Sequence, residues 1–227
     1  MVSEKVNLGF CPVEVGIGSH MVMLYEEEGE LLDALSKFFV TGLKNNEFCI
    51  FLYPREELAK KIEEKIGLEK SLKEKRMHFI YYKNFYFKGN RFSKKNAYIL
   101  IKNALDEIIV KGLKLLRGAS EMSWVINTNL FKKVVNFENE ITEKFSDSKV
   151  LFVCAYPVRS LSTPDLIDII QSHMMLIYKK GRKWCVSETV ERKILKGKIE
   201  DLEKFYKIAI KRELELKKLK EKIKKAG

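Results

Sequence analysis

Short runs of apolar residues recur along the first 180 residues and alternate with longer segments whose apolar residues have helical spacing. The runs are strand-sized, and they are His20–Tyr25, Phe48–Tyr53, Met77–Tyr82, Leu113–Leu116, Lys149–Tyr156 and His173–Tyr178. Strands that are apolar on both faces and alternate with helices are typical of a parallel sheet covered on both sides. The pattern therefore predicts a doubly wound, mostly parallel α/β domain over residues 19–186, preceded by an N-terminal lead-in at 1–18.

The amino-acid composition changes at residue 187, where a segment rich in Lys and Glu and free of Pro begins. Residues 187–227 are enough for a helix of about 40 residues, or roughly 60 Å at 1.5 Å per residue. Their apolar residues follow coiled-coil spacing, which favours a dimerising coiled coil over a helix that packs back on its own domain. The seam consists of Leu195, Ile199, Leu202, Phe205, Ala209, Leu216, Leu219 and Ile223.

The formal net charge is +12, and most of the excess comes from lysine. Because these lysines are interleaved with glutamate along helices, they indicate a solvated surface, and nucleic acid is not expected as a partner. No apolar run reaches the roughly 18 residues that a membrane helix needs, and no signal peptide is evident. The four cysteines form no CxxC pair. A cytoplasmic protein with reduced thiols and no membrane association is expected.

A doubly wound sheet raises the question of nucleotide binding, yet the chain has no phosphate-binding loop. Neither GxxxxGK[ST] nor GxGxxG follows the first predicted strand. The turn at that position carries Glu26, Glu27 and Glu28, whose carboxylates would repel a polyphosphate. ATP hydrolysis and a bound cofactor are therefore not expected.

Aromatic residues stand at or just after the carboxyl ends of the predicted strands, where open α/β sheets bind ligands. They include Tyr25, Tyr53, Trp124 and Tyr156. The segment LRGASEMSW adds Arg117 and Glu121, which we expect to form an ion pair beside Trp124, since neither type is often buried unpaired. A mostly apolar pocket with a few polar groups is typical of a small-molecule site, and a purely structural ion pair is the alternative.

Cys154 and His173 are a second candidate for a functional pair of residues. Together they would make a thiolate nucleophile or a metal site, but their spacing cannot show that they meet. The residue pattern by itself favours a structural role for His20 and His173, as hydrogen-bonded histidines in the core or at a sheet edge. We do not expect an enzyme.

Several pieces of the chain resemble a known family when taken together and in order. They are HMVMLY at 20–25, KFFVTGLKNNE at 37–47, LRGASEMSW at 116–124, FVCAYP at 152–157 and the segment around His173. They are similar to MEDS domains, the DcmR-type sensory domains of methanogens and methylotrophs. The resemblance implies a RecA/KaiC-like fold without a P-loop, in an archaeal signalling protein that senses small hydrocarbon derivatives. The matching positions, implied as ligand-binding, are His20, Tyr25, Arg117, Glu121, Trp124, Cys154, Tyr156 and His173.

The residues and the resemblance together predict a ligand-sensing module of prokaryotic signal transduction. A small organic ligand is expected at the strand ends, with Arg117 holding its polar group and Glu121 orienting Arg117. The C-terminal helix would form a homodimer and pass the signal to a kinase or a transcription factor. The alternative is a degenerate RecA-like regulator that binds nucleotide or nucleic acid through its basic surface.

Overall fold

The computed structural model describes residues 4–67 and 76–188, together with 197–198, 202, 204–215 and 217 in the C-terminal segment. The chain divides into two compact units, Met1–Ser187 and Glu188–Gly227. In the second unit, residues 204–215 are helical and their side chains are exposed. The expected seam positions Leu195, Ile199, Leu216, Leu219 and Ile223 lie outside the described residues.

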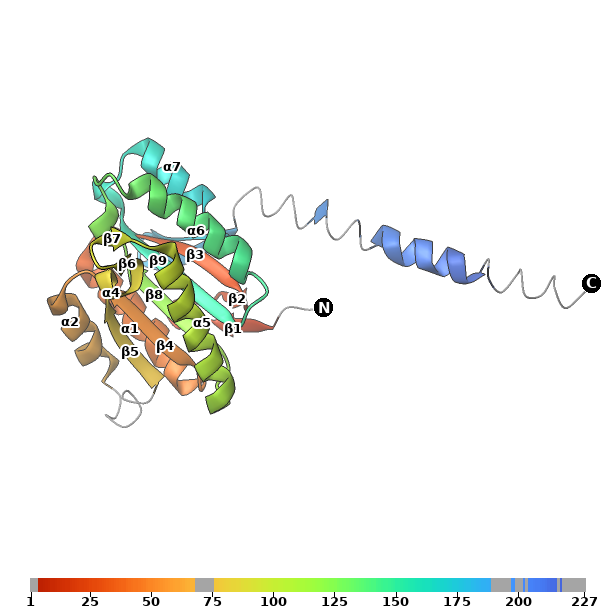
Figure 1. Ribbon diagram of the computed structural model, residues 1–227, viewed down its shortest axis with the longest axis horizontal. Coiled ribbons are helices and arrows are strands. Elements are labelled where there is room, and N and C mark those ends of the chain that lie inside the picture. The colour runs from red at the N-terminus through yellow and green to blue at the C-terminus, as the bar shows by residue number, and fades with distance from the viewer. Residues whose placement is uncertain are drawn as a thin grey trace, which may run out of the picture. The chain divides into compact units, whose positions relative to one another are not determined.

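A seven-stranded sheet forms the centre of the first unit (Figure 1). Its spatial order is β11-β10-β3-β9-β8-β4-β5, and all neighbouring pairs from β10 to β5 are parallel. The last strand, β11, returns beside β10 after a tight turn at Gly181. The bounds are Ser19–Tyr25 (β3), Phe48–Tyr53 (β4), Met77–Tyr81 (β5), Leu116–Glu121 (β8), Val150–Pro157 (β9), Met175–Lys180 (β10) and Lys183–Glu188 (β11).

Helices cover both faces of this sheet, which confirms the predicted doubly wound α/β class. Helices α1 (Glu28–Lys44) and α2 (Glu56–Ile66) pack on one side, called here the α1 face. Helices α5 (Lys94–Lys111), α6 (Phe131–Phe145) and α7 (Thr163–Gln171) pack on the other, called the α6 face. Side chains that alternate along each strand therefore enter two separate hydrophobic cores.

The smaller elements close the edges of this arrangement. The N-terminal lead-in contains an antiparallel pair, β1 (Lys5–Asn7) with β2 (Glu14–Gly16), whose Val6 and Val15 are buried. Between β5 and α5 lie a short helix, α4 (Tyr82–Tyr86), and a two-residue hairpin pair, β6 (Phe87–Lys88) with β7 (Arg91–Phe92). Short 3₁₀ helices follow β8 and β9 at Ser123–Val125 and Val158–Ser160.

The fourth predicted strand was misplaced. The apolar run Leu113–Leu116 led us to expect a strand there, whereas β8 begins at Leu116 and runs to Glu121, with all six residues buried. Its sequence LRGASE is too polar to register as a core strand in a hydrophobicity pattern. It is buried nonetheless because its Arg, Ser and Glu side chains find hydrogen-bond partners, which removes most of the cost of burial.

Candidate functional site

The turn between β3 and α1 is where a P-loop protein of this architecture would hold phosphate, and here it holds carboxylates. Arg159 forms ion pairs with both Glu26 and Glu27, at 2.9 and 2.6 Å. Glu28 at the start of α1 pairs with Arg55 and with Lys61. The nearby cations are thus paired with this chain's own glutamates, and the arrangement is unfavourable for a bound polyphosphate.

Arg117 does not pair with Glu121, so that prediction was wrong. Its Nε and Nη2 donate hydrogen bonds to Glu47, and Nη2 also donates to the carbonyl of Asn7 at 3.0 Å. The guanidinium lies over the ring of Phe38, 4.5 Å from its centroid, and neither Arg117 nor Glu47 is exposed to solvent. Gly42 makes this close packing possible, since a Cβ there would lie 2.6 Å from Arg117 Cδ. Arg117 is therefore a structural residue inside the α1 face.

Glu121 has a separate set of partners at the carboxyl end of β8. Tyr25 donates its hydroxyl to Glu121 at 2.6 Å, and Ser123 donates both its backbone N–H and its hydroxyl. Burial raises the pKa of Glu121 above its ordinary value. Because four residues of strand span about 13 Å, Arg117 and Glu121 lie too far apart in one strand to meet. Glu121 and Tyr25 tie the ends of β3 and β8 together.

Trp124 and Tyr156 belong to the hydrophobic core of the α6 face. The Trp124 ring stacks on Tyr82 at 4.6 Å between centroids and contacts Tyr86 at 5.0 Å. Tyr156 is fully buried, and burial raises the pKa of its hydroxyl well above its ordinary value. Within the described ranges, the Tyr156 hydroxyl and Trp124 Nε1 have no hydrogen-bond partner.

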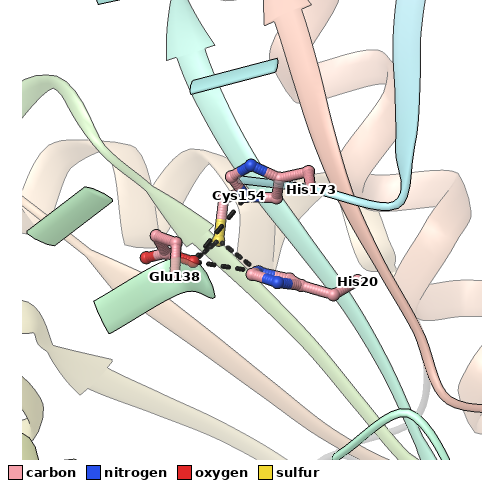
Figure 2. Close-up of side chains that lie close together, drawn as sticks. All are labelled: His20, Glu138, Cys154 and His173. Atoms are coloured by element: carbon pink, nitrogen blue, oxygen red, sulfur yellow. Dashed lines mark hydrogen bonds and ion pairs between the residues drawn. The ribbon is translucent and has the colours of Figure 1, made fainter. Parts of the chain in front are cut away.

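Four polar side chains meet on the α6 face, and they include three of the eight predicted residues. His20 from β3, Cys154 from β9 and His173, which follows α7, converge on Glu138 of α6 (Figure 2). One oxygen of Glu138, Oε2, lies 2.9 Å from His20 Nε2, 3.3 Å from Cys154 Sγ and 3.7 Å from His173 Nε2. His20 Nε2 is also 3.4 Å from Cys154 Sγ. The structure thus answers whether Cys154 and His173 share a site: both contact Glu138.

The protonation states of this four-residue cluster follow from its surroundings. Burial opposes ionisation of Glu138, but the hydrogen bond and charge of His20 outweigh it and hold the Glu138 pKa below its ordinary value. Burial and the Glu138 charge raise the pKa of Cys154 well above its ordinary value, so this cysteine is a thiol. Burial and the charge of His20 lower the pKa of His173 to about 3. A buried neutral thiol is a poor nucleophile, which argues against a Cys154–His173 catalytic pair.

A small cavity borders the cluster. Its volume is about 60 Å³, and its wall combines sheet residues with side chains of α5 and α6, among them Ile50, Ile101, Ile141 and Phe152. The lining is almost entirely apolar apart from His20, Glu138, Cys154 and the hydroxyl-bearing Ser120 and Tyr86. Of the eight predicted site residues, His20 and Cys154 line this cavity. The other six are not part of its wall.

Glu138 was missed in the sequence, although a signal was present. It follows Val134 by four residues and precedes Ile141 by three, so it occupies a core position in the apolar stripe of α6. A carboxylate at such a position is rarely buried without a partner. Glu47, the partner of Arg117, offered no comparable signal, because it follows a turn and precedes β4.

Comparison with protein-family models matches residues 19–174 to the methanogen/methylotroph, DcmR sensory domain, abbreviated MEDS. The chain belongs to the MEDS family. The match runs from the start of β3 to Met174 and therefore includes all four residues of the cluster. This part of the chain is thus a sensory domain, as the sequence resemblance implied.

Solved structures similar to the MEDS domain support its RecA/KaiC-like fold. A KaiC-like protein from the hyperthermophilic archaeon Pyrococcus horikoshii has a TM-score of 0.56 at 11 % identity, covering 83 % of this chain and 90 % of its own. An uncharacterised protein from the same organism, solved with an unknown peptide, has a TM-score of 0.56 at 12 % identity, covering 76 % and 83 %. No curated protein matches the chain. In the part of the chain that the structure describes, no helix has the length and apolar character to cross a membrane.

Proposed function

We propose that the MEDS domain of this protein binds a small, largely apolar organic molecule in the cavity of the α6 face and acts as a non-enzymatic sensor. The observation that carries the proposal is the cavity itself. It has a volume of about 60 Å³ and a mostly apolar lining, to which His20, Glu138 and Cys154 add polar groups. Small-molecule sites in proteins commonly have this composition. The position differs from the strand ends expected from sequence, because the polar residues there are paired with one another.

The dimensions of the cavity limit the ligand to a few non-hydrogen atoms. At most about 1.5 kcal/mol of binding free energy is available per such atom, so a four-atom ligand gains at most about 6 kcal/mol. That corresponds to a Kd of roughly 40 μM at best, and millimolar values are more typical of molecules this small. Short alcohols, amines and carboxylic acids have an apolar portion for the cavity and one group that can hydrogen-bond to His20 or Glu138.

The proposed signal passes from the cavity to the C-terminal unit. The cavity wall includes strands β3, β8 and β9 and helices α5 and α6, so filling it would alter packing across the whole α6 face. The exposed apolar side chains of the helix at 204–215, including Phe205 and Ile208, are the surface through which two copies would associate. A kinase or a transcription factor would read the change. A nucleotide-binding regulator is less consistent with the paired carboxylates at Glu26 and Glu27.

Thermal unfolding with a panel of short alcohols, amines and acids tests the proposal. At a ligand concentration 100 times Kd, stability rises by about 2.7 kcal/mol, which raises the Tm of a chain this size by about 5 to 11 °C. Ile101→Phe should abolish the shift by occupying the cavity from α5. Ile109→Phe is the matched control, because Ile109 is on the same helix but 75 % exposed.

The outcomes separate clearly. A shift that Ile109→Phe retains and Ile101→Phe loses supports binding in the cavity. A rise in Tm that Ile101→Phe retains places the ligand outside the cavity. Pressurised xenon is an additional apolar probe, and if neither xenon nor any member of the panel raises the Tm, the proposal of a cavity-based sensor is refuted.

A further inference from the structure

We propose that His20, Glu138, Cys154 and His173 bind a single divalent transition-metal ion of the zinc class. Each offers one ligand atom, and all four atoms lie within 4.8 Å of one another in the buried interior (Figure 2). They come from β3, α6, β9 and the segment after α7. A metal here would crosslink four elements that are distant in sequence. This inference rests on the geometry of the four ligand atoms and not on the proposed ligand-sensing function, and it shares His20, Glu138 and Cys154 with the wall of the cavity.

The separations suit a tetrahedral site. Zinc bonds of about 2.0 to 2.3 Å at tetrahedral angles place neighbouring ligand atoms about 3.3 to 3.6 Å apart. His20 Nε2 lies 2.9 Å from Glu138 Oε2 and 3.4 Å from Cys154 Sγ, and Glu138 Oε2 lies 3.3 Å from Cys154 Sγ and 3.7 Å from His173 Nε2. Shifts of about half an ångström therefore bring these pairs to tetrahedral separations.

Both histidines present the correct nitrogen. The Thr142 hydroxyl donates its hydrogen to the Ser172 carbonyl, so it can only accept from His20 Nδ1, at 2.8 Å. The Ile169 carbonyl likewise can only accept from His173 Nδ1, at 2.7 Å. Each Nδ1 therefore carries a hydrogen. The Nε2 lone pair of His173 is directed into the cluster, and that of His20 becomes available to a metal once the proton that His20 shares with Glu138 has left. Metal-binding histidines are typically fixed by such a hydrogen bond on the opposite nitrogen.

A hydrogen-bonded cluster without metal leaves one atom unexplained. His173 Nε2 is fully buried and has no hydrogen-bond partner among the described residues. A buried polar atom without a partner is costly, and native proteins rarely tolerate one without a reason. The His20 proton and the Cys154 thiol are both directed at Glu138, and the Glu138 carboxylate can only accept, so none of the three donates a hydrogen to His173 Nε2. A metal ion would satisfy this nitrogen and the three other ligand atoms at once.

The charges also balance. Two neutral imidazoles, one carboxylate and one thiolate carry a total charge of −2, which cancels that of a divalent cation, so no net charge is buried. Binding breaks the S–H bond of Cys154 and displaces the proton between His20 and Glu138. Two protons leave for solvent, and nothing is oxidised or reduced. A set of two nitrogens, one sulfur and one oxygen in tetrahedral arrangement is typical of zinc.

Cobalt(II) substitution is the most direct test. The full chain is unfolded in chelator, refolded with Co²⁺ and examined by absorption spectroscopy, with folding checked by circular dichroism. We expect one equivalent of Co²⁺ per chain, a thiolate-to-cobalt charge-transfer band and the intense visible bands of tetrahedral cobalt. Cys154→Ser should lose the charge-transfer band, and His173→Gln should lose the tetrahedral spectrum.

Matched controls are available on the same sheet. Cys49→Ser changes another fully buried cysteine, and His78→Gln changes another strand histidine, neither of which belongs to the cluster. Both should keep the wild-type spectrum. Folded wild-type protein without a charge-transfer band, or a band that Cys154→Ser retains, overturns the proposal.

A variant that keeps all four ligands tests the geometry. Thr142→Val removes the hydroxyl that orients His20 and changes little in volume. We expect the affinity for Co²⁺, measured by competition with a chromogenic chelator, to fall about 10- to 100-fold. An unchanged affinity would overturn the assignment of His20 as a ligand.

Discussion

Replacing Glu47 with glutamine should destabilise the sensory domain strongly, although Glu47 does not line the cavity. Glu47→Gln keeps the shape of the side chain but removes the charge that faces the Arg117 guanidinium. Arg117 would then keep two neutral hydrogen-bond acceptors, the Asn7 carbonyl and the side-chain amide oxygen of the new glutamine, and no anion. Both side chains are fully buried, so water cannot replace the lost partner.

The expected magnitude follows from that burial. Arg117 donates two hydrogen bonds to Glu47, and hydrogen bonds to charged groups contribute about 1.5 to 3 kcal/mol each. Breaking a buried ion pair by removing one partner typically costs about 3 to 5 kcal/mol, because the other charge is left unpaired. For a chain of 227 residues this lowers the Tm by roughly 6 to 20 °C.

Urea unfolding followed by tryptophan fluorescence measures the effect, since Trp124 and Trp184 both lie in the first unit. Glu107→Gln, which breaks a partly exposed pair with Lys111, is the matched control and should change stability by less than about 0.5 kcal/mol. The double variant Arg117→Met with Glu47→Leu should be more stable than Glu47→Gln. A loss below about 1 kcal/mol for Glu47→Gln would refute this reasoning.

Three further substitutions test other parts of the structure. Gly42→Ala should destabilise by about 1 to 3 kcal/mol, because its Cβ would lie 2.6 Å from Arg117 Cδ, whereas Gly29→Ala in the same helix meets open space and should be neutral or slightly stabilising in urea unfolding. Burial raises the pKa of Glu121, so its carboxyl ionises at lower pH in the unfolded state than in the folded state, and the free energy of unfolding falls as pH rises from about 4.5 through the folded pKa. Glu121→Gln should remove this contribution to the pH dependence of stability, measured as the difference between the unfolding free energies of the two proteins across pH. Phe205→Glu should convert a dimer into a monomer in sedimentation experiments without changing the Tm of the first unit, and an unchanged sedimentation coefficient would contradict dimerisation through this helix.

The architecture could be read from the sequence because burial leaves a strong pattern. Strands β3, β4 and β9 are covered on both faces, so they appear as continuous apolar runs. Gly112 after α5 and the Ser162-Thr163-Pro164 start of α7 mark helix ends through local backbone geometry, which a sequence carries directly. Local conformational preferences are enough for such features.

The pattern failed at β8 because polar residues there are buried. From hydrophobicity alone we ended the predicted strand at Leu116 and placed Arg117 and Glu121 after it, where we expected them to pair, whereas β8 runs to Glu121. In the extended strand they lie about 13 Å apart, and each finds a partner from another element. A correct strand boundary would have excluded the pair from sequence alone.

The eight positions that the family resemblance indicated were brought together only in part. His20, Cys154 and His173 meet on the α6 face, whereas Arg117 and Tyr25 enter the α1 face, because side chains of neighbouring strand residues point in opposite directions. Glu138, which joins the three, comes from a helix whose packing on the sheet is set by distant contacts. The sequence by itself determined the sheet, the covering helices, the acidic turn and the family. Only the tertiary structure decided which polar residues share a face, and therefore where the cavity and the four-residue cluster lie. The members of the cluster are 16 to 153 residues apart along the chain, so no local pattern connects them.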